Sequence, residues 1–89
     1  MDDTELMAAL AQSAGAQEIY RLHATFVAYR DGTGEKIRIE VLDRGPGHRD
    51  RWSVKATSED TGAYATGNGE ADLKMAILTT HWEHLNQQH

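Results

Sequence analysis

The sequence is poor in the residues on which many functional classes depend. It contains no cysteine and a single proline, with one phenylalanine, three tyrosines and two tryptophans. The absence of cysteine excludes a disulfide framework, thiolate metal sites and thiol catalysis. The longest apolar runs, residues 8–11 and 75–78 among them, are far shorter than the ~20 residues of a membrane-spanning helix. The acidic first residues differ from a secretory signal, so we expect a soluble cytoplasmic protein without a membrane partner.

Charge is distributed unevenly along the chain. The formal net charge is −5 over 89 residues, a length that predicts one domain over residues 1–89. Residues 1–18 carry four acids and no base, residues 19–55 carry eight bases and five acids, and residues 56–89 carry five acids and one base. A mildly basic middle between two acidic ends is a pattern that can mark a partner surface.

Two apolar periods divide the chain into helices and strands. Leu6, Met7, Leu10 and Ala14 follow one another at helical spacing, and Gly15 is a typical helix-ending residue, so we expect a short N-terminal helix. From residue 19 the apolar residues alternate with a period of two, which predicts strands joined by short turns. The expected strands are residues 19–29, 36–41, 51–57 and 63–66, with a polar loop over residues 44–50.

A last helix is predicted after the Gly67-Asn68-Gly69 turn. Its apolar residues fall at spacings of four, three, four and three, and they are Ala71, Met75, Leu78, Trp82 and Leu85. Such a stripe is typical of one continuous helix that covers a sheet. The sequence therefore predicts an α+β fold, with an antiparallel sheet of about four strands, a C-terminal helix packed on one face and a short N-terminal helix.

Two surfaces are candidates for binding a protein partner. The first is an acidic patch expected near the fourth strand, formed by Glu59, Asp60, Glu70 and Asp72. The second is the outer face of the sheet, with Arg21, Arg38 and Tyr29. Because no convincing active site accompanies them, we expect a non-catalytic protein-binding module that occupies a surface on a partner protein or complex. An exposed first strand is also compatible with a homodimer.

A nucleic-acid-binding domain is the alternative. Cationic side chains crowd the second hairpin: Arg44, His48, Arg49 and Arg51. A projecting basic hairpin can enter a nucleic-acid groove, and binding of that kind weakens steeply with salt.

Residues 37–85 resemble part of a double-stranded-RNA-binding domain. That family runs helix, three strands, helix, and the Gly45-Pro46-Gly47-His48 loop stands where the family has Gly-Pro-x-His. Trp52 follows at the spacing of the family's aromatic residue, and Gly67-x-Gly69 matches the glycines before its last helix. The resemblance implies a similar fold and a minor-groove contact through Pro46 and His48. The family's lysines at the start of that helix are replaced here by Glu-Ala-Asp-Leu, and such acids repel a phosphate backbone.

A looser similarity links the chain to small α+β proteins of phages and mobile elements, of which anti-CRISPR inhibitors are one group. These proteins act by occupying a nucleic-acid-binding surface on another protein. The similarity therefore implies an inhibitor that works by steric or charge-complementary occupation.

Catalytic and metal chemistry have few candidate residues. His81 and His84 lie three residues apart on the predicted last helix and would share a face, as metal ligands on helices do. No matching second pair of ligands accompanies them. The three serines, Ser13, Ser53 and Ser58, do not stand in a Gly-x-Ser-x-Gly motif. We expect no catalytic residue, no metal site and no cofactor.

Overall fold

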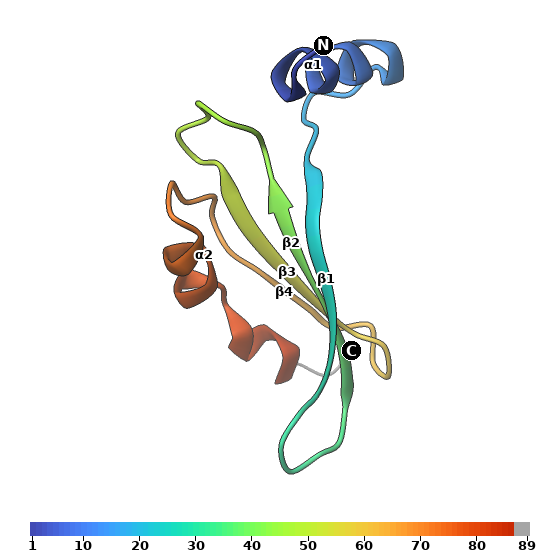
Figure 1. The fold of residues 1–89 in the computed structure, drawn as a ribbon. Helices are drawn as coiled ribbons and strands as arrows, with labels where there is room; N and C mark the ends of the chain where they lie inside the picture. The colour runs from blue at the N-terminus through green and yellow to red at the C-terminus, as the bar shows by residue number, and fades with distance from the viewer. Residues whose placement is uncertain (87–89) are drawn as a thin grey trace.

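A computed structural model describes residues 1–86, which form a four-stranded antiparallel sheet with helices before and after it (Figure 1). The elements are α1 (Asp3–Ala14), β1 (Arg21–Tyr29), β2 (Lys36–Asp43), β3 (Trp52–Ser58), β4 (Tyr64–Thr66), α2 (Leu73–Thr79) and the 3₁₀ helix η1 (Trp82–Asn86). The strands lie in sequence order, and each pairs antiparallel with the next. The α+β class that the sequence predicts is confirmed.

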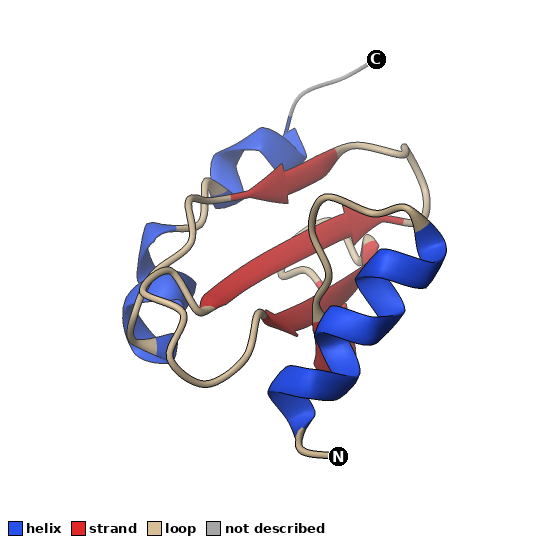
Figure 2. Ribbon diagram, turned by 90° about the horizontal axis from the view of Figure 1, so that it is seen from above, coloured by secondary structure: helices blue, strands red, loops and turns tan. Residues whose placement is uncertain are grey.

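Helix α1 ends at Gly15 as its sequence predicts, and Asp2 caps its start. The Asp2 carboxylate accepts a hydrogen bond from the Glu5 amide at 2.8 Å, and Gly15 ends the helix in the left-handed region, at φ 67°. The helix lies beyond one end of the sheet rather than over a face (Figures 1 and 2). Only Met7 is buried in it, against Gly45, whereas Leu6 and Leu10 are exposed. Most of the apolar stripe of α1 therefore stays in solvent.

The core lies between one sheet face, here called the inner face, and the C-terminal helices. Two small clusters of buried residues form it. Ile37, Ala56 and Ala65 pack with Leu85 of η1 in one cluster, and Val41 and Val54 pack with Ala76 of α2 in the other. Trp82 packs against both clusters. Alanines at three of these positions let the helices approach the sheet closely, and the helix contacts fall on β3 and β4.

The first strand carries an irregularity that the sequence does not reveal. Its register against β2 shifts between Leu22 and Ala24, which is a β-bulge at His23. Ala24, Phe26 and Ala28 lie on the inner face, as the alternation predicts. Strict alternation would place Leu22 on the inner face with these residues. The bulge places it on the opposite face instead, because one extra residue reverses the side of every residue before it.

The predicted continuous C-terminal helix is wrong, because the chain leaves helical geometry at Thr80. Three side chains donate to carbonyl groups of the last turn of α2: Thr79 Oγ1 to Met75 O at 2.8 Å, Thr80 Oγ1 to Ala76 O at 2.7 Å and Trp82 Nε1 to Ile77 O at 2.9 Å. Carbonyls satisfied in this way need no amides from a following turn. Thr80 then takes an extended conformation, and η1 starts two residues later.

The break also changes which side of the helix is buried. Ala76 is 1% exposed, whereas Met75 and Leu78 of the predicted stripe are 45% and 65% exposed. Of the predicted stripe, only Trp82 and Leu85 pack against the sheet, and both belong to the separate helix η1.

The glycines before α2 serve close packing. A β-carbon at Gly69 would lie 2.8 Å from the carbonyl oxygen of Asp50, and one at Gly67 would lie 3.1 Å from that of Thr79. The turn therefore brings the start of α2 against the β2–β3 loop and its end against β4. None of the helices in residues 1–86 combines the length and apolar character needed to cross a membrane.

Candidate functional site

The face of the sheet opposite the core, here called the outer face, presents a mixed set of side chains. Residues paired across antiparallel strands share a face, so the register defines its rows. One row is Val27, Arg38, Thr57 and Tyr64, and the next is Thr25, Glu40, Lys55 and Thr66. Neither α2 nor η1 packs on these rows, because the buried residues of both helices lie in the two inner clusters.

Two tyrosines flank a cation on this face. Tyr29 is 68% exposed and Tyr64 is 58% exposed, at opposite edges of the sheet, and Arg38 lies between them on β2. Arg38 is exposed and forms no ion pair within residues 1–86. The Lys55 ammonium lies 5.7 Å from the centre of the Tyr64 ring, which is within cation–π range. Exposed tyrosine and arginine side chains suit recognition of a partner surface.

The structure places two of the three residues predicted for this surface on it. Tyr29 pairs with Lys36 and Arg38 pairs with Val27, which puts both on the outer face. Arg21 lies elsewhere, because the bulge aligns it with Asp43, whose side chain points to the inner side. The Arg21 guanidinium instead forms an ion pair with Asp3 at 2.6 Å and so ties β1 to α1. Tyr64 and Lys55 complete the surface, although the sequence prediction did not include them.

The four predicted acidic residues do not form one patch. Glu59 and Asp60 lie at the β3–β4 turn, where Glu59 pairs with the Lys36 ammonium at 3.1 Å. Glu70 lies at the opposite end of β3, where its backbone pairs with Trp52. Asp72 caps α2 by accepting a hydrogen bond from the Lys74 amide at 3.2 Å. The seven residues of β3 separate the two pairs, and most of these carboxylates have local structural partners.

Carboxylates neutralise part of the positive charge of the basic β2–β3 loop. Arg44 pairs with Glu18 at 3.0 Å and lies over the Tyr20 ring, and Arg51 is bound to Asp43. His48 and Arg49 are exposed at the tip, next to the exposed Asp50. Two of the four predicted cations are thus paired with carboxylates. The minor-groove contact that the RNA-binding resemblance implies stays a prediction.

Asp43 is a structural carboxylate. Arg51 donates two hydrogen bonds to it, and the Gly45 amide donates a third at 2.9 Å. The Arg51 hydrogen bond outweighs the burial and holds the pKa of Asp43 below its ordinary value. The Arg51 guanidinium also lies 4.6 Å from the centre of the Trp52 ring, and the His23 and Trp52 rings form a T-shaped pair with their centres 5.1 Å apart. This cluster fixes the start of the loop in place.

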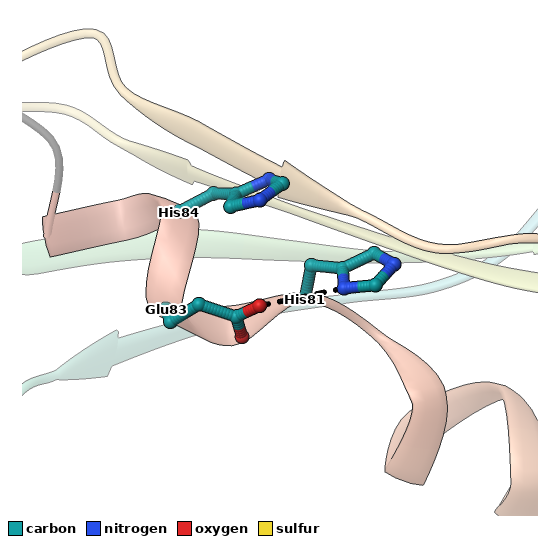
Figure 3. Close-up of side chains that lie close together, drawn as sticks. All are labelled: His81, Glu83 and His84. Carbon is teal, nitrogen blue, oxygen red and sulfur yellow. Dashed lines mark ion pairs between the residues drawn. The ribbon is translucent and has the colours of Figure 1, made fainter.

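His81, Glu83 and His84 form an exposed cluster of metal-ligand types at the start of η1 (Figure 3). Their ligand atoms lie within 4.8 Å of one another. His81 Nδ1 is 3.4 Å from a Glu83 carboxylate oxygen, and the two imidazole rings stack with their centres 5.3 Å apart. The Glu83 backbone amide, and then His81, hold the pKa of the Glu83 carboxyl below its ordinary value. Three adjacent ligands facing solvent could hold a divalent cation together with water.

Open hollows in the described surface lie beside some of these residues. One lies between the outer face and the β2–β3 loop, lined in part by Tyr20, Arg44 and Lys55. Another lies beside the β1–β2 turn and contains Glu35 and Asp60. Glu35 accepts hydrogen bonds from Arg30 and Ser58, whose donors hold its pKa below its ordinary value. A carboxylate stabilised in its ionised form is a weak base, so Glu35 is poorly suited to accept a proton.

Comparison of the chain with protein-family models, with curated proteins and with solved structures finds no match.

Proposed function

We propose that this domain is a non-catalytic protein-binding module that contacts its partner through the outer face of the sheet, around Tyr29, Arg38 and Tyr64. The observation that carries the proposal is the exposure of both tyrosines on either side of an arginine that has no ion-pair partner within residues 1–86. Tyrosine and arginine dominate the binding energy of many protein interfaces, because they combine large contact area with directional hydrogen bonds.

The charge of this face indicates the kind of partner. Lys36, Arg38 and Lys55 project from it with one acid, Glu40, although Lys36 is paired with Glu59 at the edge. The face is therefore more basic than the chain as a whole, whose net charge is −5. An acidic patch on another protein suits it, because opposite potentials steer encounter and fix register. Such a module acts by occupying that patch and excluding its other ligands.

The test compares quantitative capture by the wild-type domain with capture by a double variant, Arg38→Glu with Tyr64→Ala. Lys74→Glu is the matched control, because it makes the same charge change on the exposed start of α2. A partner bound through the outer face should lose at least about thirty-fold in affinity for the double variant, as expected for the loss of a hot spot, and little for the control.

Two outcomes contradict the proposal. In the first, the double variant binds the purified partner as tightly as the wild-type domain does. In the second, the domain binds short RNA or DNA instead, with an affinity that falls steeply as salt rises. Loss of that binding in Arg49→Glu would then assign the contact to the loop.

A further inference from the structure

The edge of the sheet at β1 is unusually open. Within residues 1–86 the strand pairs only with β2, so one side of its nine-residue backbone is left without sheet partners. Its exposed apolar side chains are Leu22, Phe26, Val27 and Tyr29, each more than half exposed. It contains no proline and no lysine, and its one cation, Arg21, is paired with Asp3. Natural sheets normally protect such an edge, because it is a template for pairing with another strand.

The opposite edge of the same sheet shows the contrast. Strand β4 has only three residues, and η1 packs against it. A short, covered edge offers few backbone groups to another chain. The sheet is therefore protected at β4 and open at β1.

The inner face is also incomplete on this side. Helix α2 packs on β3, and η1 packs on β3 and β4. Phe26 lies on the same inner face, opposite Ile39, yet it is 56% exposed. A phenylalanine at the rim of the core, beyond the reach of the helices, gains most by burial if the sheet is extended past β1.

We propose that a second copy of this chain pairs antiparallel with β1, so that the two sheets join into one sheet of eight strands. The bulge at His23 limits regular pairing to the residues that follow it, and a twofold axis at Phe26 makes residues 24–28 self-complementary. Phe26 then faces Phe26 of the second copy, and Ala24 faces Ala28 on either side of the pair. On the outer face, Thr25 faces Val27.

Side-chain size supports this register. The small side chains of Ala24 and Ala28 flank Phe26 on its own strand, which leaves room for two aromatic rings to meet at the axis. Aromatic pairs across neighbouring strands stabilise a sheet. Centring the axis on Thr25 or Val27 instead would set Phe26 against an alanine and would bring His23 or Arg30 into the paired region.

The exposed area at the β1 edge approaches that of a specific dimer. A fully buried aromatic residue removes roughly 150–250 Å² from solvent, so Phe26 and Tyr29 together still offer about 200 Å² in each copy. Leu22, Val27 and the nine-residue backbone add to this. A specific interface requires roughly 1,000 Å² in total, which the edge residues of the two strands approach when Val27 and Tyr29 of the outer face are included. Tyr29 is thus shared with the partner surface proposed above, whereas Arg38 on β2 and Tyr64 on β4 lie away from the paired edge and stay available in the dimer.

The first test is the mass of the protein in solution, measured by light scattering and sedimentation over a range of concentrations. The wild-type chain should have about twice its monomer mass of 9.9 kDa. Phe26→Glu places two like charges at the axis and should give a monomer with an unchanged circular dichroism spectrum. Leu78→Glu is the control, because Leu78 is more exposed than Phe26 but lies on α2, and this variant should stay dimeric.

The second test determines the register of the β1–β1 pair and leaves Phe26 unchanged. Because the natural chain has no cysteine, Thr25→Cys and Val27→Cys chains can be mixed and oxidised. Preferential formation of the mixed disulfide is the expected result. A monomeric wild-type chain, a dimeric Phe26→Glu variant, or disulfides formed equally between like chains would each overturn the proposal.

Discussion

Arg51 closes the β2–β3 loop onto Asp43, with Nε 2.7 Å from Oδ1 and Nη2 3.0 Å from Oδ2. Asp43 is 6% exposed, so its charge is stabilised by these donors rather than by water. Asp43→Asn keeps the shape of the side chain but removes the charge, and it should lower the free energy of unfolding by about 2 kcal/mol. Denaturant unfolding followed by tryptophan fluorescence measures this. Asp50→Asn, in the same loop, is the control, and equal effects of the two variants would contradict the assignment.

The stability of the domain should decline in acid because of two carboxyl groups. A hydrogen bond from Ser58 lowers the pKa of Glu35, and one from Arg51 lowers that of Asp43. A carboxyl whose pKa is lower in the folded state contributes stability that is present above its unfolded pKa and is lost as pH falls through its folded pKa. The free energy of unfolding should therefore stay level near neutral pH and fall below about pH 4.

The double variant Glu35→Gln with Asp43→Asn tests the origin of this decline. It should show lower stability at neutral pH and a shallower loss between neutral pH and about pH 3. Thermal unfolding at a series of pH values measures both quantities. If the double variant lost stability in acid as steeply as the wild-type chain, other groups would be responsible.

Local patterns in the sequence predict the sheet, because strands with one buried face alternate strictly and the turns between them contain glycine. The same patterns fail where the outcome depends on contacts between segments. The bulge at His23 is a property of two paired strands, so it reversed the face of Arg21 without a local signal. The break at Thr80 depends on donors whose acceptors exist only in the formed helix.

In the candidate site, too, local alternation predicts some positions, and contacts between segments decide the others. Arg38 and Tyr29 follow from the alternation of long strands, and the structure places both on the outer face. Tyr64 belongs to a strand of three residues, too short for an alternation to show which face it takes. Glu59 and Glu70 lie on either side of the short strand β4 in the sequence. Because β4 runs antiparallel along β3, the two acids lie at opposite ends of β3.

The corrected position of the C-terminal helix can be tested by two leucine substitutions. Leu78 is 65% exposed on α2, so Leu78→Ala should change the free energy of unfolding by less than about 0.5 kcal/mol. Leu85 is 4% exposed in the cluster with Ile37 and Ala56, so Leu85→Ala should cost about 2–5 kcal/mol. A continuous helix with the predicted stripe would bury both leucines and make the two costs similar, and chemical denaturation of the two variants distinguishes these outcomes.

The cluster of His81, Glu83 and His84 should bind zinc only weakly. Structural zinc sites surround the ion with four protein ligands, and their histidines are oriented by further hydrogen bonds. Here three exposed ligands lie on one short turn, and the side-chain partner of His81 within residues 1–86 is Glu83 itself. Binding must therefore compete with water at each ligand and with the existing His81–Glu83 contact.

Zinc titration monitored by the fluorescence of Trp82, which adjoins the cluster, measures this affinity. We expect a gradual change in fluorescence that does not saturate at micromolar zinc. The change should be smaller in His84→Ala. It should be unaltered in His48→Ala, the control, which removes a histidine from the distant β2–β3 loop. Saturation below micromolar zinc that is abolished in His84→Ala would show instead that the turn is a true metal centre. Addition of a chelator would then be expected to lower the stability of the zinc-loaded domain, because metal binding to the folded state is coupled to its stability.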